Sequence, residues 1–157
     1  YSENNLVFVR LLWNPDVTRT NCPSGKNQQC EFSINLSAWN GQEIDYWFEL
    51  EDIAGNYDLS KKINITVDIT PPVINFFNYT PVGRSLVFFF NITEINFKEI
   101  TYIDSSDSKP KEKTLCTRLK NSICDVKKSF STGQHNLILF IKDKAGNSVE
   151  ENSLFII

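Results

Sequence analysis

The sequence predicts an all-β protein made of two tandem β-sandwich modules, residues 1–69 and residues 70–157. The segment Asp52–Asn56 (Asp-Ile-Ala-Gly-Asn) returns 91 residues later as Asp143–Asn147 (Asp-Lys-Ala-Gly-Asn). Each copy lies between two apolar stretches, which is the position of a hairpin turn whose glycine adopts a positive φ. A pair of cysteines with seven residues between them also recurs, once in each half. A repeated turn together with a repeated cysteine pair indicates two similar modules.

Five strands are expected in the first module, because five short apolar or alternating runs are separated by turn residues. They are Leu6–Trp13, Thr18–Cys22, Cys30–Leu36, Ile44–Leu50 and Leu59–Ile69. The first run is apolar on both faces and should be buried, whereas Cys30–Leu36 alternates and should bury one face. The Pro71-Pro72 pair cannot continue a central ladder, so it ends the module in a short, stiff linker.

Seven strands are expected in the second module, by the same reading of apolar runs and turns. They are Val73–Tyr79, Ser85–Ile92, Phe97–Ile103, Leu115–Thr117, Ile123–Phe130, Gln134–Lys142 and Val149–Ile157. Seven strands spaced about ten residues apart are typical of an immunoglobulin-type sandwich.

Aligning the modules on the repeated turn shows that they differ in length. Glu3, Asn5, Leu6 and Val9 fall on Glu94, Asn96, Phe97 and Ile100. Residue 1 then corresponds to residue 92, so the first module lacks its first two strands. Three explanations are open: the natural protein continues upstream, a neighbouring copy donates strands, or the first module is smaller. The absence of methionine favours a mature or excised piece of a longer protein.

The four cysteines predict two disulfides, Cys22–Cys30 and Cys116–Cys124, since the spacing is the same in both modules. The single histidine and the long spacing argue against a metal site. Disulfides place the protein outside the reducing cytosol. Four Asn-x-Ser/Thr triplets support an extracellular protein with possible N-glycans, on Asn35, Asn64, Asn78 and Asn91.

Composition excludes two classes of partner. The net charge is −3, the isoelectric point is about 5.2 and the basic residues are scattered, so nucleic-acid binding is not expected. The longest apolar runs have about five residues, far below the roughly 20 that a bilayer-spanning helix needs. No membrane span is expected in this segment.

No residue set predicts catalysis or a cofactor. Asp52 and Asp143 could bind calcium with Asp68 or Glu51, but no spaced acidic run supplies the six to eight oxygens that calcium needs. We expect each carboxylate to accept bonds from the amides of its own turn, with Gly55, Asn56, Gly146 and Asn147 completing the turns. His135 lacks a Gly-x-Ser-x-Gly elbow and is expected at the surface.

A possible contact surface is predicted on one strand of the second module. Leu86–Phe90 is apolar on both faces, although a sandwich strand has one inner face. Its outer residues, Val87 and Phe89, together with Trp47, are candidates for contact with a neighbouring module or subunit of the same protein. The alternative is a central strand covered by a loop or a glycan.

The repeated motifs resemble those of a known family. The Asp-x-Ala-Gly-Asn turn, the Asp-x-Thr-Pro-Pro linker at Asp68–Pro72 and the Gly-Gln pairs at Gly41 and Gly133 are similar to tandem immunoglobulin-like repeats of bacterial and archaeal cell-surface proteins. The resemblance implies a non-catalytic structural or adhesive role at the cell surface. Alternatives are a filament or pilus subunit assembled by donor-strand complementation, and a spacer module of a secreted hydrolase. The short-range cysteine pair departs from the usual repeats.

Overall fold

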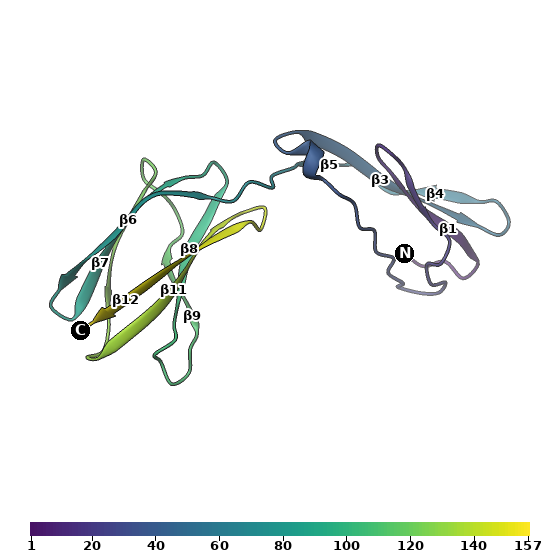
Figure 1. Cartoon of the computed structure of the whole chain (residues 1–157). Coiled ribbons are helices and arrows are strands. Elements are labelled where there is room, and N and C mark those ends of the chain that lie inside the picture. The colour runs from purple at the N-terminus through teal and green to yellow at the C-terminus, as the bar shows by residue number, and fades with distance from the viewer. The chain divides into compact units, whose positions relative to one another are not determined.

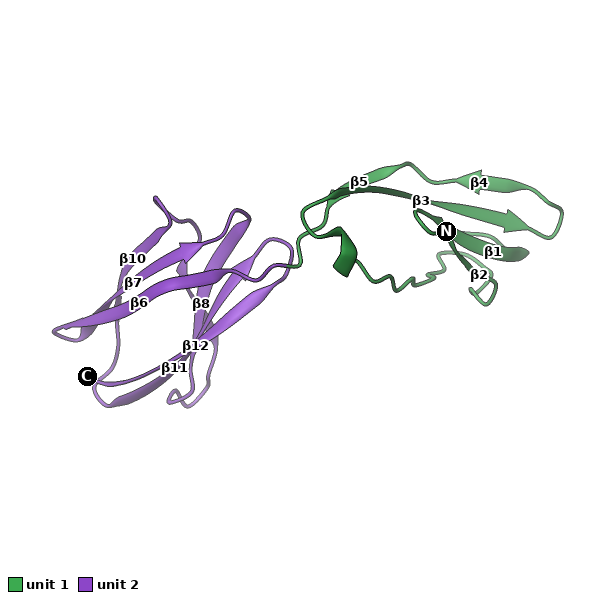
Figure 2. Cartoon of the chain, turned by 45° about the horizontal axis from the view of Figure 1, so that its top comes forward, with its two compact units in different colours: residues 1–69 green, residues 70–157 purple.

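The computed structural model describes residues 1–157 and divides them into two compact units, unit 1 (Tyr1–Ile69) and unit 2 (Thr70–Ile157) (Figures 1 and 2). All regular structure is antiparallel β-strand except a single 3-10 turn, η1, at Ser37–Trp39. The all-β prediction is therefore confirmed. No helix has the length and apolar character that a bilayer crossing requires.

Unit 2 is a sandwich of two antiparallel sheets, as Figure 2 shows. Its strands are β6 (Val73–Val82), β7 (Ser85–Thr93), β8 (Phe97–Asp104), β9 (Glu112–Cys116), β10 (Ile123–Ser129), β11 (Gln134–Asp143) and β12 (Ser148–Ile156). One sheet has the order β10-β7-β6, and the other has the order β12-β11-β8-β9. Seven strands in two sheets agree with the sandwich read from the sequence.

The core of unit 2 lies between these sheets and follows from strand alternation. On β7, the side chains of Leu86, Phe88, Phe90 and Ile92 have no exposed surface. They belong to one apolar cluster with the inward residues of β11. Complete burial of each such side chain stabilises the fold by about 1.5–3 kcal/mol, so β7 contributes much of the stability of unit 2.

Unit 1 contains one sheet. Its strands are β1 (Leu6–Leu12), β2 (Val17–Arg19), β3 (Glu43–Asp52), β4 (Tyr57–Leu59) and β5 (Ile63–Thr66). The order is β2-β1-β3-β4, and β5 also pairs with β3. The pairing registers show which strands of the two units correspond. Strands β1 and β2 of unit 1 correspond to β8 and β9 of unit 2, β3 corresponds to β11, and β4 and β5 together correspond to β12. Counterparts of β6 and β7 are absent from unit 1.

The predicted strand Cys30–Leu36 is not formed. The segment is extended, and its odd-numbered residues are exposed while its even-numbered residues are half-buried, as the alternation predicted. In unit 2 the equivalent strand, β10, pairs with β7 along its whole length. Because unit 1 has no strand in that place, residues 30–36 have no partner for a ladder.

The predicted strand Leu59–Ile69 is also wrong in its extent, because it is broken between β4 and β5. The backbone amide of Phe48 donates to the Ser60 hydroxyl at 2.9 Å, where a ladder would offer a carbonyl. The same hydroxyl donates to the Lys61 carbonyl at 3.0 Å. A serine side chain that competes for backbone groups in this way interrupts the pairing.

Candidate functional site

In both units the aspartate of the repeated turn accepts hydrogen bonds from its own turn. In unit 1, Asp52 Oδ1 accepts from the amides of Ala54 (2.8 Å) and Asn56 (2.9 Å), and Asp52 Oδ2 accepts from Asn56 Nδ2 at 2.8 Å. The bond from the Asn56 side chain, followed by those from backbone amides, lowers the pKa of Asp52. Gly55 has a φ of +79°, which a residue with a side chain rarely adopts.

In unit 2 the carboxylate of Asp143 accepts from the amides of Gly146 (2.7 Å) and Asn147 (2.8 Å) and from Asn147 Nδ2 (2.7 Å). Gly146 has a φ of +100°. The prediction that each Asp satisfies its own turn is confirmed by these bonds. Both carboxylates are thereby committed to the backbone of the turn.

A second contact fastens each turn to the segment ahead of β1 or β8. In unit 1, the Ile53 amide donates to the Asn5 carbonyl at 2.9 Å, and the Asn5 amide donates to Glu3 Oε1 at 2.9 Å. Unit 2 repeats both bonds 91 residues later, between Lys144 and Asn96 and between Asn96 and Glu94. We name this arrangement the turn clasp. It defines a repeated structural element that extends beyond the five-residue motif.

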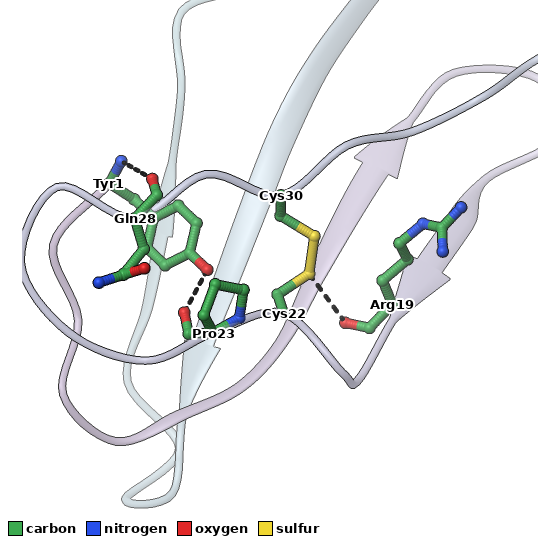
Figure 3. Close-up of a disulfide and its surroundings, with 6 residues drawn as sticks. All are labelled: Tyr1, Arg19, Cys22, Pro23, Gln28 and Cys30. Carbon is green, nitrogen blue, oxygen red and sulfur yellow. Dashed lines mark hydrogen bonds between the residues drawn. A yellow bond between two sulfur atoms is a disulfide. The ribbon is translucent and has the colours of Figure 1, made fainter.

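Both predicted disulfides are present and no cysteine is free. The Cα atoms are 5.4 Å apart in Cys22–Cys30 and 6.3 Å apart in Cys116–Cys124. Figure 3 shows the first bridge beside Tyr1, whose amino group donates to the Gln28 carbonyl at 3.3 Å. Each bridge closes a short loop within one unit. Two intact bridges indicate a non-reducing environment.

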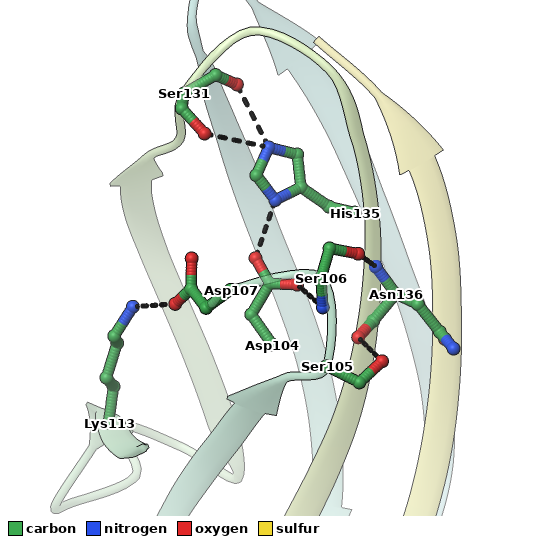
Figure 4. A network of polar contacts seen from close by, with 8 residues as sticks. All are labelled: Asp104, Ser105, Ser106, Asp107, Lys113, Ser131, His135 and Asn136. Carbon is green, nitrogen blue, oxygen red and sulfur yellow. Dashed lines mark hydrogen bonds and ion pairs between the residues drawn. The ribbon is translucent and has the colours of Figure 1, made fainter. Parts of the chain in front are cut away.

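His135 is buried, with 4% of its surface exposed, so the prediction of a surface histidine is wrong. It occupies the second position of β11, which points inward, as does Ile44 at the second position of β3. Figure 4 shows its ring between two oxygen acceptors. Nδ1 lies 2.5 Å from Asp104 Oδ2, and Nε2 lies 2.9 Å from the Ser131 carbonyl.

Both ring nitrogens face oxygen acceptors, an arrangement that favours the doubly protonated ring. Burial by itself lowers the pKa of His135, but the bonds to Ser131 and Asp104 and the nearby negative charges outweigh it and raise the pKa. Burial likewise raises the pKa of Asp104, but the bonds from His135 and from the Ser106 amide reverse this and lower the pKa. Asp104 and His135 therefore form a buried ion pair.

The same geometry argues against a Ser-His-Asp catalytic triad. A catalytic serine needs a histidine whose Nε2 is free to take its proton. Here Nε2 donates to the Ser131 carbonyl, and Ser131 Oγ is farther away, at 3.5 Å. The ion pair instead joins the end of β8, the start of β11 and the segment between β10 and β11.

The candidate contact residues of unit 2 lie together on the outer face of β7. Val87 and Phe89 are half-buried and point away from the core residues Phe88 and Phe90. Phe89 meets Phe76 of β6 edge to face, with ring centroids 6.0 Å apart. Phe76 is 52% exposed, so an aromatic patch reaches solvent.

Trp47, the third candidate contact residue, belongs to unit 1. Its ring lies beneath the Lys62 ammonium, which is 5.5 Å from the ring centroid. With Trp13 and Trp39 it lines an open pocket of about 270 Å³. All three tryptophans of the chain therefore lie around one hollow of unit 1.

The four sequons differ in accessibility. Asn35, Asn64 and Asn78 are exposed. Asn91 is half-buried, and its Oδ1 accepts a bond from Asn75 Nδ2 at 3.2 Å. Asn35, Asn64 and Asn78 are therefore the more accessible sequons, although Asn64 Nδ2 donates to Asp45 Oδ1 at 2.9 Å.

The inner face of the unit 1 sheet is open, a feature that the sequence indicated only through the alignment of the two modules. An apolar groove of about 280 Å³ runs between this face and residues 30–36. Phe32, Ile34, Tyr46, Phe48 and Ile65 are among its lining residues. On the equivalent face of unit 2, β7 and β6 occupy this space.

Comparison with known proteins identifies no family, since no protein-family model and no curated protein matches the chain. The functional interpretation therefore rests on the turn clasps, the disulfides and the open face of unit 1. The turn clasps and the disulfides each join segments of a single unit.

Proposed function

We propose that the chain is an extracellular, non-catalytic repeat segment of a microbial cell-surface protein, with a structural or adhesive role. The observation that carries this proposal is the turn clasp, whose two bonds recur in both units. Repetition of a structural element at a fixed offset is typical of repeat proteins, in which modules set length and spacing. The resemblance to immunoglobulin-like surface repeats supports the same role.

A non-catalytic role is supported by the hydrogen bonds and the ion pair that the potentially reactive side chains already make. The carboxylates of Asp52 and Asp143 are satisfied by their own turns. The only histidine is held in a buried ion pair. The bonds to these groups stabilise the backbone around them, so we assign them no catalytic role and the proposal includes no cofactor.

An extracellular location is supported by the two disulfides and by the exposed sequons. Disulfides persist where the environment is not reducing. Asn35, Asn64 and Asn78 are exposed, as N-glycan sites must be. The expected partners are neighbouring modules or subunits of the same protein, contacted through apolar outer patches such as that of Val87 and Phe89.

A second candidate function is that of a filament or pilus subunit joined by strand donation. The open groove of unit 1 favours it, because such filaments are held by strands that add to an incomplete sheet. In that case the purified chain should form concentration-dependent polymers that resist denaturant. A strictly monomeric chain at high concentration would contradict it.

The proposed location is tested by labelling intact cells of the source organism with antibodies raised against this chain. We expect labelling without permeabilisation, and a loss of mass after enzymatic removal of N-glycans. An antibody to a cytosolic protein serves as the control for cell integrity. Labelling that appears only after permeabilisation would overturn the proposed function.

A further inference from the structure

The inner face of unit 1 is less buried than the same face of unit 2. The β3 residues Tyr46, Phe48 and Leu50 are half-buried, whereas the matching residues of β11 have no exposed surface. Ile65 of β5 is 36% exposed, and its counterpart Phe155 of β12 is 7% exposed. Apolar residues alternate on this face as they would in a closed sandwich, so it has the chemistry of a core without the cover of one.

Unit 2 shows which structure covers this face. The hairpin of β6 and β7 lies over β11 and β12, with Phe88 and Phe90 of β7 in the core. Tyr79 of β6 reaches β12, where its hydroxyl donates to the Leu154 carbonyl at 3.1 Å and its ring lies 5.8 Å from that of Phe155. Both strands of the hairpin are needed, because β7 covers the middle of the sheet and β6 covers its β12 edge.

Residues 30–36 of unit 1 present the edge to which such a hairpin would pair. Cys30 matches Cys124 of β10, which lies opposite Phe90 of β7. None of the backbone amides from Glu31 to Ile34 donates to another backbone carbonyl. Phe32 already contacts Phe48 across the groove, with ring centroids 5.6 Å apart. The segment is therefore extended, apolar on its inner side and unpaired on its backbone.

The position of Tyr1 gives the register. Its amino group donates to the Gln28 carbonyl at 3.3 Å, and the Ile92 amide of β7 donates to the Ser122 carbonyl at 2.8 Å. Gln28 precedes Cys30 by two residues, as Ser122 precedes Cys124. Tyr1 thus occupies the place of Ile92, at the end of the second strand of the hairpin. A strand that led into Tyr1 would run antiparallel to residues 30–36.

We propose that the groove of unit 1 is a docking site for a β-hairpin of the β6–β7 type, joined through its second strand to Tyr1. Its second strand pairs with residues 30–36 and places large apolar side chains opposite Cys30, Phe32 and Ile34. Its first strand covers Ile65. This site is independent of the proposed function, because it concerns the folding of unit 1 and not the location of the protein.

The test adds a copy of residues 71–91 directly ahead of Tyr1 in the full chain. Amide hydrogen exchange is then measured for Glu31–Ile34. We expect protection of these amides to rise at least ~100-fold, because a paired strand opens far less often than an unpaired segment. The core amides of β11, measured in the same sample, show whether unit 2 remains folded.

A matched control carries L86S, F88S and F90S in the added copy only, which keeps its length and its hairpin turn. It should leave the exchange of Glu31–Ile34 as it is in the unmodified chain. A second fusion adds only residues 85–91, the second strand of the hairpin. It should protect the amides of Glu31–Ile34 from exchange. Ile65 should still bind a hydrophobic dye, because the first strand that would cover it is missing. Unchanged exchange in both fusions, or equal protection in the serine control, would overturn the docking site.

A free peptide of residues 71–91 distinguishes the source of the hairpin. A connected strand acts at an effective concentration in the millimolar range, so the free peptide at ~10 µM should leave the exchange unchanged. Protection by the free peptide at that concentration would overturn the connection to Tyr1 and would favour strand donation between chains.

Discussion

Replacing Asp104 with asparagine should destabilise unit 2 by about 3–5 kcal/mol, because the buried His135 ring loses its counter-charge. Both side chains of the pair are almost completely buried, so solvent screens their attraction very little. The ring also lies between Phe130 and Phe155, with centroids 5.2 and 5.3 Å away. Without Asp104 the buried ring either keeps a charge that no contacting carboxylate compensates or gives up its proton on folding, and both cost stability.

The same pair predicts how stability depends on pH. The raised pKa of His135 gives stability that is complete below 6.5, its unfolded value, and is lost as pH rises through the folded pKa. The lowered pKa of Asp104 gives stability that is present above 3.8 and is lost as pH falls through its folded pKa. The pair therefore contributes most to stability between these two pH values. The size of the contribution follows from the pKa shifts, because a tenfold difference in proton affinity between the folded and unfolded states corresponds to about 1.4 kcal/mol.

Two probes separate the units in this experiment. All three tryptophans lie in unit 1, so tryptophan fluorescence follows unit 1 during urea unfolding. Amide exchange of the β11 core residues follows unit 2. We expect the unfolding free energy of unit 2 to fall as pH rises above 6.5, the unfolded pKa of His135, while unit 1 serves as the internal control.

In the D104N variant this fall should disappear, because a buried histidine without its carboxylate no longer gains protons on folding. As His135 is the only histidine, its ring titration is read directly from proton NMR. A titration below the usual value in the unmodified chain, or the same pH slope in both proteins, would refute the ion pair.

Three further predictions concern the turn, the bridges and the core. Asp143→Ala should destabilise unit 2 by about 2–3 kcal/mol, and Asp52→Ala should destabilise unit 1 less, because Asp143 is buried and Asp52 is not. Urea unfolding followed with the two probes compares the variants, and equal losses would contradict the reasoning. Reduction of both disulfides should cost about 2–3 kcal/mol for each loop of about nine residues, measured by thermal unfolding with and without reductant. Leu139→Ala should lower the unfolding free energy of unit 2 by about 2–5 kcal/mol. Phe48→Ala should lower that of unit 1 clearly less, because Phe48 is partly exposed to solvent, and the urea midpoints of the two variants test this difference.

Local features of this protein were predictable from the sequence. The turns were found because Asp-x-Ala-Gly-Asn combines a positive-φ glycine with a carboxylate that reaches its own amides. The disulfides were found because the same short cysteine spacing recurs in both halves of the sequence. The seven strands of unit 2 were found because apolar alternation reports which face is buried.

The features that were missed depend on partners distant in the sequence. Residues 30–36 alternate like a strand, but a strand also needs a neighbour, and alternation does not show whether one exists. His135 was expected at the surface because no catalytic motif accompanies it, whereas it lies at the inward-pointing second position of β11. Its partner Asp104 is 31 residues away, and no motif connects the two.

The two units have different residues in the layer of the core that holds the Asp104–His135 pair in unit 2. By the repeat offset, Asp104 and His135 of unit 2 correspond to Trp13 and Ile44 of unit 1. A buried ion pair needs surroundings that hold both partners, and in unit 2 the ring of Phe155 stacks on His135. In unit 1 the residue matching Phe155 is the partly exposed Ile65, and the layer is apolar, with Trp13 against Trp39 at 5.7 Å. An apolar layer tolerates a loosely covered edge, because it holds no charge that must be kept from water. The polar layer therefore occurs in the unit whose sandwich is closed, and the apolar layer occurs in the unit whose groove is open.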